Sequence, residues 1–281
     1  MLSNLLLYEL ILIITGSILF LALVFAFIWY VIKNKSIMSL LPFFIIPIAM
    51  IAWPTINSIS YENGKVEIQK LAQEVKAAPA DSIKRAELEK ALEKISKNRS
   101  EDDVQALIYR AEAQSALGNY DAAEQIINKA LMFESENGEA IQVKKKILEQ
   151  KEVQANFNQD VIELQENLSR LADPAYTSTT GDFDNISEIL TNLKVPVYTD
   201  EASLITVSKA LSTVDEKETS MSIAEKVIEA NPASESAKEV KTDIETGKLK
   251  PIRTQEGGAE IKNPELKNLD KVVIQSQRMH Q

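Results

Sequence analysis

The side chains that most often perform enzyme chemistry are scarce in this chain. Its single histidine is His280, and it contains no cysteine. A histidine acts as a general base or a metal ligand, and a thiolate acts as a nucleophile, only where a folded element holds partners around it. His280 lies in a segment expected to be flexible, and the pair Gly257 and Gly258 lacks the Lys-Ser/Thr of a phosphate-binding loop. The sequence therefore predicts no catalytic residue, no cofactor, no metal ligand and no enzyme activity.

Acidic residues are numerous, and two groups of them could do chemistry. Glu101, Asp102 and Asp103 follow Ser100. Clustered carboxylates can bind calcium, but calcium loops place their ligands at alternate positions. At the start of a helix the same residues cap free amides and complement the helix dipole, which is the simpler interpretation. Glu9 precedes an apolar segment, and we expect it at a membrane interface rather than in an intramembrane proton relay.

Two apolar segments near the start of the chain determine where the rest of the protein lies relative to a membrane. Residues 10–32 and 37–56 contain no charged side chain, and a helix of roughly 20 apolar residues spans a bilayer. Because residues 33–36 are too few for a domain, the two segments are predicted to form a transmembrane hairpin. A cleaved signal peptide is the alternative, but residues 1–9 lack the basic side chains that begin such peptides.

The short connection between the segments predicts their orientation. It carries Lys33 and Lys35 and no acid, whereas residues 1–9 carry no basic side chain. Short loops rich in lysine remain in the cytoplasm. The turn is therefore predicted to be cytoplasmic and both ends of the chain to lie on the other side. In a bacterial inner membrane, the C-terminal module would then be periplasmic.

The chain is acidic, with 31 Lys and Arg against 41 Asp and Glu and a net charge of −10. Such a surface repels nucleic acid and anionic lipid, so we expect no nucleic-acid partner. It would suit a basic or neutral protein partner, and simple solubility is the other explanation of the same charge. The oligomeric state is left open by the sequence.

Residues 104–131 have the pattern of two amphipathic helices around a turn at Gly118. Small residues at Ala111, Ala123 and Ala130 stand where two helices must approach closely. This segment resembles the tetratricopeptide repeat (TPR), a helix–turn–helix unit of about 34 residues. The resemblance implies an all-α module that binds proteins.

Two further units of the same kind are predicted after the first. A second turn is expected at residues 181–184, and a third unit has its turn at Asp215, one repeat length after Gly181. Pro232 falls at the usual terminal proline of the repeat, and residues 236–245 would form a closing helix. An unrelated helical bundle is the alternative.

Helical patterns also occur outside these units. An amphipathic helix ahead of the repeats is predicted from four apolar residues: Ile83, Leu88, Leu92 and Ile95. A long helix over residues 140–171 carries one apolar stripe: Phe157, Val161, Leu164, Leu168 and Leu171. The stripe is typical of a helix that faces a core, and a short dimerising seam is the alternative.

These patterns together predict an all-α protein in four parts. The tail is expected to be largely extended or disordered, with one docking helix at Leu266, Leu269, Val272 and Val273. The parts are a transmembrane hairpin over residues 1–56 (spans 10–32 and 37–56), a helical linker or cap over 57–103, TPR-like repeats over 104–246 and a flexible tail over 247–281.

The resemblance to TPR units also implies where a partner binds. Such units present a groove lined by their first helices. In the first unit these positions are Gln105, Ile108, Tyr109, Glu112 and Ser115. They are not the basic and amide set that clamps a C-terminal carboxylate. A mixed apolar and acidic groove suits a protein or peptide partner that presents an amphipathic helix with basic residues.

The layout as a whole resembles the TPR component of the bacterial cytochrome c maturation system. That resemblance implies binding of apocytochrome c, and a chain without cysteine would suit a partner with a Cys-x-x-Cys-His motif. The family has a long connection between its spans, where this chain has residues 33–36. The leading hypothesis is wider: a membrane-anchored scaffold or assembly chaperone of the cell envelope. A structural subunit of a larger membrane complex is a further alternative.

Overall fold

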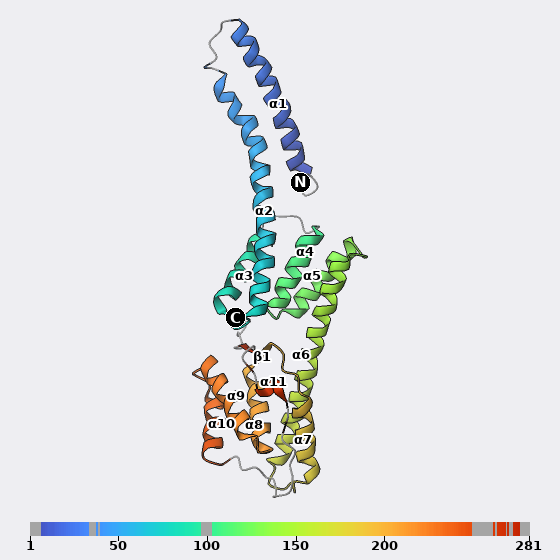
Figure 1. The fold of residues 1–281 in the computed structure, drawn as a ribbon, viewed down its shortest axis with the longest axis vertical. Helices are drawn as coiled ribbons and strands as arrows, with labels where there is room; N and C mark the ends of the chain where they lie inside the picture. Colours follow the sequence, from blue (N-terminus) through green and yellow to red (C-terminus); the bar gives the residue numbers. More distant parts are fainter. Residues whose placement is uncertain are drawn as a thin grey trace.

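The molecule is elongated, with a helical hairpin at one end and a helical body at the other (Figure 1). This computed structural model describes residues 7–33, 38, 40–96, 103–248, 261, 263–267, 269 and 272–275. Helices form nearly all of the described secondary structure, and the exception is one two-stranded sheet. The predicted all-α class, with two long apolar helices ahead of a helical module, is confirmed.

The hairpin pairs α1 (Leu7–Ile32) with the first part of α2 (Ile45–Ala77), which follows a short 3-10 helix, η1 (Leu41–Phe44). Both helices are long and apolar enough to cross a membrane. They approach closely at Gly16, where an added Cβ atom would lie 3.0 Å from the Cβ atom of Met50. A small residue at this point lets two membrane helices pack together.

Large apolar side chains cover the outside of the hairpin. Phe25, Ile32 and Trp53 are all well exposed in the isolated chain. Such a surface is unfavourable in water, and lipid chains would cover it in a bilayer. Lys33 lies beside α1 with its ammonium 5.3 Å from the ring centre of Trp29. Lys35, the other lysine of the predicted cytoplasmic turn, lies outside the described residues.

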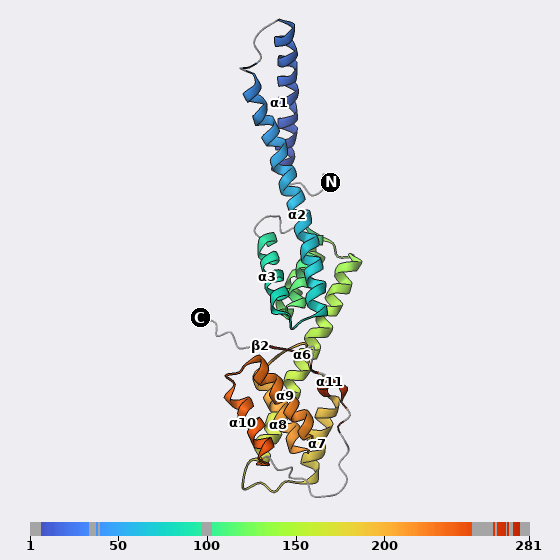
Figure 2. The same cartoon turned by 60° about the vertical axis from the view of Figure 1, so that its left-hand side comes forward.

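Helix α2 does not end where its apolar segment ends. It continues from Asn57 to Ala77, and the turned view shows it running from the hairpin into the body (Figure 2). The predicted boundary at residue 56 therefore falls inside one helix. The second part of α2 has a buried stripe at helical spacing, formed by Tyr61, Ile68, Ala72 and Val75. This stripe joins the core of the body, so the hairpin and the body share a continuous helix.

The first half of the body packs the second part of α2 against three further helices and the start of a fourth. These are α3 (Ser82–Ser96), α4 (Val104–Ala116), α5 (Tyr120–Phe133) and the start of α6 (Gly138–Leu171). The helix–turn–helix predicted around Gly118 is confirmed in α4 and α5. Ala111, Ala123 and Ala130 are completely buried between these helices and α6, because larger side chains would hold the helices apart.

The predicted helix ahead of the repeats is α3, and one of its four apolar residues faces outward. Leu88, Leu92 and Ile95 are buried, whereas Ile83 is 70% exposed. Ile83 stands five residues before Leu88, which places it about 140° away around the helix. It therefore lies off the stripe that faces the core.

The second half of the body begins with the C-terminal part of α6 and continues through five elements. These are α7 (Thr180–Asn192), β1 (Tyr198–Asp200), α8 (Glu201–Thr213), α9 (Lys217–Ala230) and α10 (Glu235–Glu245). A single apolar core holds them together. Helix α10 confirms the closing helix predicted after the third unit.

The stripe on α6 belongs to this core. Phe157, Val161 and Leu164 are buried in it, and Leu168 and Leu171 are partly buried against it. The core-facing interpretation of the stripe is therefore confirmed. Because these side chains contact helices of the same chain, they are not available as a seam for a second copy.

The turn predicted at Gly181 is wrong. Gly181 lies in the first turn of α7, after Thr179, which forms a capping box with Asp182. Acidic residues beside a glycine are equally typical of a helix start, since carboxylates there bind free amides. The chain instead leaves α6 after Leu171, several residues before α7 begins.

The two halves of the body repeat one design. The helix cap Asp103 of the first half corresponds to Asp200 in the second half, and the turn at Gly118 corresponds to the turn at Asp215. The separation along the chain is the same for both pairs. Each cap accepts a hydrogen bond from the amide three residues later, at 3.0 and 2.9 Å. Each turn has a positive φ angle, 83° and 70°. The shift also pairs buried residues: Leu107 with Leu204, Ala140 with Ala237, and Ile147 with Ile244.

The C-terminal tail packs across the second half. It contains the short α11 (Pro264–Lys267) and β2 (Val273–Gln275), which pairs in parallel with β1. The predicted docking helix is therefore wrong in form, because only α11 is helical. The β-branched pair Val272 and Val273 favours a strand over a helix. Residues 249–260, including Gly257 and Gly258, lie outside the described part of the chain.

Candidate functional site

The residues predicted to line a groove lie on α4, between α2 and α6. Ile108 is fully buried and Ser115 is almost so. The Ser115 hydroxyl donates to Oε1 of Gln150 on α6 at 2.6 Å. Tyr109 is half-buried and packs against both cores of the first half. Ile108 and Ser115 are therefore enclosed within the chain itself, and only part of the Tyr109 side chain is exposed.

The two remaining predicted groove residues make polar contacts with neighbouring helices. A carboxylate oxygen of Glu112 lies 3.6 Å from the Lys76 ammonium on α2. The Gln105 amide donates to Glu139 on α6 at 3.1 Å. The predicted binding face of α4 is thus largely an internal contact surface. The reason is that α2 continues into the body and packs against this face of α4. In an open array of repeats the same face would be exposed.

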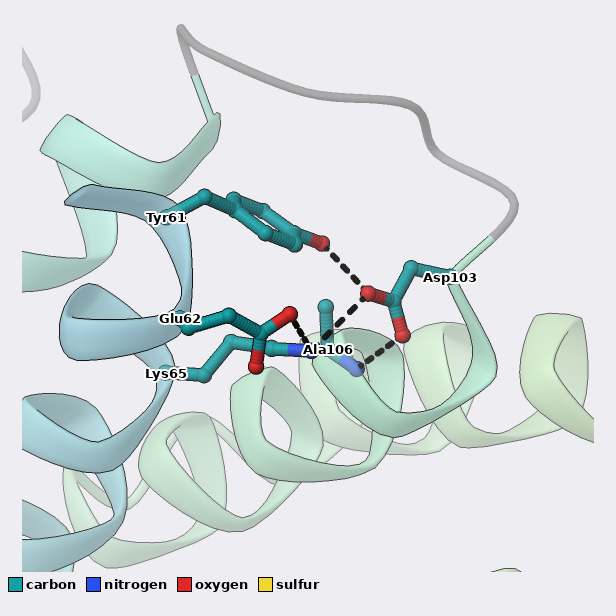
Figure 3. Close-up of polar contacts among 5 residues, drawn as sticks. All are labelled: Tyr61, Glu62, Lys65, Asp103 and Ala106. Atoms are coloured by element: carbon teal, nitrogen blue, oxygen red, sulfur yellow. Dashed lines mark hydrogen bonds and ion pairs between the residues drawn. The ribbon is translucent and has the colours of Figure 1, made fainter. Parts of the chain in front are cut away.

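A buried cation fastens α2 to the start of α4 (Figure 3). Lys65 is 5% exposed, and its Nζ lies 3.0 Å from Oε1 of Glu62 and 3.2 Å from Oδ2 of Asp103. The Tyr61 hydroxyl donates to the same Asp103 oxygen at 2.9 Å, and its ring centre is 5.0 Å from Nζ. A buried ammonium needs such partners, because water cannot reach it.

Asp103 has two roles in this cluster. Its Oδ1 accepts the amide of Ala106 and so caps α4, while its Oδ2 binds Tyr61 and Lys65. Burial alone would raise the pKa of this carboxyl, but the Ala106 amide, Tyr61 and Lys65 outweigh it, and the pKa lies below its usual value. The capping role is predictable from sequence; the partners on α2 are not. Glu101 and Asp102 lie outside the described residues.

We expect Asp103→Asn to lower the free energy of unfolding of the body by about 2 kcal/mol at neutral pH. Asparagine still caps the helix, so the loss measures the missing charge beside Lys65, whose other carboxylate partner among the described residues is Glu62. The measurement is urea-induced unfolding of the full chain in detergent. The matched control is Asp200→Asn, because Asp200 caps α8 in the equivalent place without a lysine partner among the described residues.

The pH dependence of the stability of the native chain and of Asp103→Asn tests the contribution of the Asp103 charge. A carboxyl with a lowered folded-state pKa stabilises the fold above its unfolded pKa of about 4. That contribution is lost as the pH falls through the folded value. The stability difference between the native chain and Asp103→Asn should therefore shrink below about pH 4. An unchanged difference at that pH would contradict the assignment.

A groove of about 640 Å³ lies where the two halves of the body meet. The α4–α5 turn, the middle of α6 and β1 form its sides, with these polar side chains among its lining: Asn119, Asp121, Lys151, Asn158 and Asp200. Lys151 bridges Asp121 and Glu124 at 2.8 and 2.7 Å. The Lys151 ammonium donates hydrogen bonds to these two acids, and this holds its pKa above its usual range. The groove therefore offers fixed charges of both signs.

Tyr198 connects the two halves of the body at the base of this groove, and this contact is called the joint below. Its hydroxyl donates to the carbonyl of Ala116 at the end of α4, and its ring packs on Gly118. The Arg85 guanidinium lies 5.3 Å from the ring centre. Burial raises the pKa of Tyr198, so the side chain remains neutral. A residue of the second half thus holds the turn of the first half.

The equivalent turn of the second half is held by the tail. The amide of Ile261 donates to Glu216 at 3.0 Å, and Leu266 lines a shallow hollow beside Lys217. Each helix–turn–helix is therefore covered at its turn by a segment that comes later in the chain. The groove above Tyr198 remains open, and this makes it the better candidate for a partner.

The described residues contain no group of three or more His, Cys, Asp or Glu side chains placed to hold a metal ion. His280 lies outside the described residues. The chemistry that the groove offers is hydrogen bonding and charge pairing with a bound segment.

Comparison with known proteins adds no family to this description. No protein-family model, no curated protein and no solved structure matches the chain.

Proposed function

We propose that this chain is a membrane-anchored adaptor of TPR-like architecture that binds a protein partner in the cell envelope. One observation carries the proposal: two matched helix–turn–helix units stand on a helix that continues out of an apolar hairpin. Helical repeats of this kind bury their core between neighbouring units and use the surface left over for binding. Assembly or delivery of an envelope protein is the role that fits this layout.

The second unit supports the TPR-like assignment in detail. Its residues at the places of Ala111 and Ala123 are Ser208 and Ser220, both completely buried. Their Oγ atoms lie 3.0 Å apart, and each also donates to the other's carbonyl group. Mutual hydrogen bonds let two small polar residues replace two alanines at a close helix contact.

The hairpin would place the body close to a bacterial inner membrane. Lys33 and Lys35 favour a cytoplasmic turn, which puts the body on the periplasmic side. Because α2 is continuous, the body would stand at a fixed height above the lipid. A partner could then be held next to a membrane-bound assembly site.

The partner surface is the groove between the two halves, in place of the predicted face of α4. Its carboxylates, Asp121 and Asp200, suit a basic or amide-bearing face of an amphipathic helix. The negative charge of the whole chain would steer such a partner towards it. Lys151 is already paired with Asp121 and Glu124, so the charge of this region is negative on balance.

Site-specific photo-crosslinking tests the assignment. A photoreactive amino acid in place of Asn158, in the groove, should give a discrete crosslinked protein in living cells. The same amino acid in place of Gln142, an exposed amide elsewhere on α6, should not give that product. Equal products from both positions, or none from Asn158, would contradict the groove as the partner surface.

The crosslink also separates the alternative functions. If an unrelated membrane hairpin replaces residues 1–56 and the product persists, the body itself recognises the partner. Loss of the product would favour a structural subunit that assembles through its hairpin. Identification of the product as a haem-free c-type cytochrome would establish the narrower maturation role.

A further inference from the structure

The outer side of α6 carries an apolar stripe. All of α6 lies within the described residues, and its exposed large apolar side chains are Ile141, Leu148 and Ile162, at 48%, 40% and 57% exposure. Leu148 follows Ile141 by seven residues, and Ile162 follows Leu148 by twice seven, with the exposed Ala155 at the place between. Seven residues make almost two whole helical turns. These four residues, here called the outer stripe, therefore share one face of α6.

The seven-residue spacing indicates what can cover the outer stripe. One helix packs along another through apolar residues that recur in this way, because each of them then meets the neighbouring helix on the same side. From Ile141 to Ile162 the stripe extends roughly 30 Å, since a helix rises about 1.5 Å per residue. A single helix of about 20 residues would therefore cover it.

The outer stripe and the groove between the two halves form one continuous surface. Ala155 belongs to both, and Asn158 lines the groove less than one turn further along α6. Helix α6 runs past both halves of the body, along the long axis of the molecule (Figure 1 and Figure 2). A helix bound in the groove would therefore continue along the stripe. The small side chain of Ala155 leaves room there for a larger apolar side chain.

Charged side chains beside the outer stripe change sign along it. Lys144 and Lys145 follow the first residue of the stripe by about one turn, and Glu163 and Glu166 follow the last residue within about one turn. Lys145 lies 3.8 Å from Glu149, but both side chains are well exposed, so this pair is weak. Helix α6 begins at the end of the body nearer the hairpin (Figure 1). The stripe is therefore basic near the hairpin and acidic away from it.

The order of these charges argues against a second copy of the chain as the occupant. Two copies anchored in one membrane by their hairpins would stand in the same direction, so their α6 helices would pair in parallel. The lysines of one copy would then face the same lysines of the other, and the glutamates the same glutamates. Like charges across a helix pair are unfavourable, whereas a partner with the reverse order of charges would form ion pairs at both ends.

We infer that the protein partner binds through an amphipathic helix of about 20 residues that lies along α6, over the outer stripe and the groove. The apolar side of this helix would contact Leu148, Ala155 and Ile162. Its acidic end would lie beside Lys144, nearer the membrane, and its basic end beside Glu166. The helix would be the bound segment of the partner in the proposed function, on which the inference rests.

Photo-crosslinking of the full chain in living cells tests the position of this helix. The photoreactive amino acid used at Asn158 should give the same crosslinked protein from Leu148 and from Ile162, which are exposed and tolerate replacement. Mass spectrometry of the crosslinked peptides should place these two contacts about 14 residues apart in one segment of the partner, because both helices rise equally per residue. Gln142, on another side of α6, should give no product.

The three crosslinking positions distinguish the failure of this inference from the failure of the proposed function. A crosslink from Asn158 with none from Leu148 or Ile162 would overturn the inference and leave the groove as the partner surface. A product that contains two copies of this chain would also overturn it. Absence of the product at all three positions would contradict the proposed function and the inference together.

Substitution of the outer stripe tests its apolar contacts. Leu148→Gln together with Ile162→Gln should weaken the crosslink from Asn158 at least about fivefold, because the exposed side chains lose their apolar contact with the partner. Ile83→Gln, at a similarly exposed apolar residue of α3, should leave the crosslink unchanged. Urea-induced unfolding should be the same for both proteins, which separates binding from folding. A crosslink of native strength from the doubly substituted chain would overturn the inference.

Two nearby lysines test the order of charges. Lys144 stands eleven residues, or about three whole turns, before Ala155 and so lies on the side of the outer stripe, whereas Lys146 lies on the opposite side of α6. Lys144→Glu should weaken the crosslink from Asn158 about threefold, as expected for one exposed ion pair. Lys146→Glu makes the same change of charge and should not weaken it. Equal effects of the two substitutions would contradict the inferred position of the helix.

Discussion

Ending the chain after Lys248 should lower the free energy of unfolding of the second half by at least about 4 kcal/mol, because a single buried leucine cut to alanine already loses about 2–5 kcal/mol. The truncation removes several buried apolar side chains from one core: Ile261, Leu266, Leu269 and Val272. Their partners in α7, α8 and α9 would become exposed to water. No single substitution in this half removes as much packing.

The tail also makes polar contacts with helices of the second half. The Asn263 amide donates to the carbonyls of Leu190 and Leu193 at 2.9 and 2.8 Å, which completes the end of α7. The Lys226 ammonium on α9 donates to the carbonyl of Leu269. The last carbonyls of a helix have no intrahelical donor, so α7 loses its main cap with the tail.

Hydrogen exchange of the full chain in detergent measures this effect by region. Truncation after Lys248 should speed exchange of the amides in α7 and α9 and leave those in α4 and α5 nearly unchanged. The matched control ends after Gln275, so it retains α11 and β2 and should behave like the native chain. Equal exchange of α7 in the two truncated chains would show that the tail does not support the second half.

The fold is predictable from sequence where one local pattern decides it. Around Gly118 the alanines Ala111, Ala123 and Ala130 mark a close helix pair, and the structure confirms it. In the second copy the close contact uses Ser208 and Ser220. Serine is common on surfaces, so only the mutual hydrogen bonds, which depend on the fold, reveal that these two are buried.

The candidate site is less predictable, because it depends on contacts between distant segments. The composition changes at Asn57, which indicates the end of a membrane span, yet the helix continues and covers the face of α4. Tyr198 likewise gives no local sign that its ring lies on Gly118 or that its strand pairs with Val273. Pairing between remote segments is set by the assembled core rather than by nearby residues.

Gly118→Ala should lower the free energy of unfolding of the body by about 3 kcal/mol, through two separate effects. The φ angle at Gly118 is +83°, and alanine loses roughly 1–2 kcal/mol in that left-handed conformation. A Cβ atom there would lie 2.5 Å from Cδ2 of Tyr198. The ring or the turn must then move, which costs about 1–3 kcal/mol in a packed interior.

Gly247→Ala isolates the first of these effects. Gly247 has a φ angle of +67°, and an added Cβ atom meets nothing within 4 Å. Its replacement should lose only about 1 kcal/mol. Both variants are measured by urea-induced unfolding. Equal decreases in the free energy of unfolding at the two glycines would mean that the Tyr198 ring does not clash with the added Cβ atom at position 118.

A double-mutant cycle with Tyr198→Ala isolates the second effect. Once the ring is absent, Gly118→Ala should lose only about as much as Gly247→Ala, so the two substitutions should be coupled by roughly 1–3 kcal/mol. Tyr198 belongs to the second half of the body and Gly118 to the first. The coupling energy therefore measures the joint between the halves. Because that joint forms the base of the groove, Gly118→Ala should also weaken the crosslink from Asn158, whereas Gly247→Ala should not.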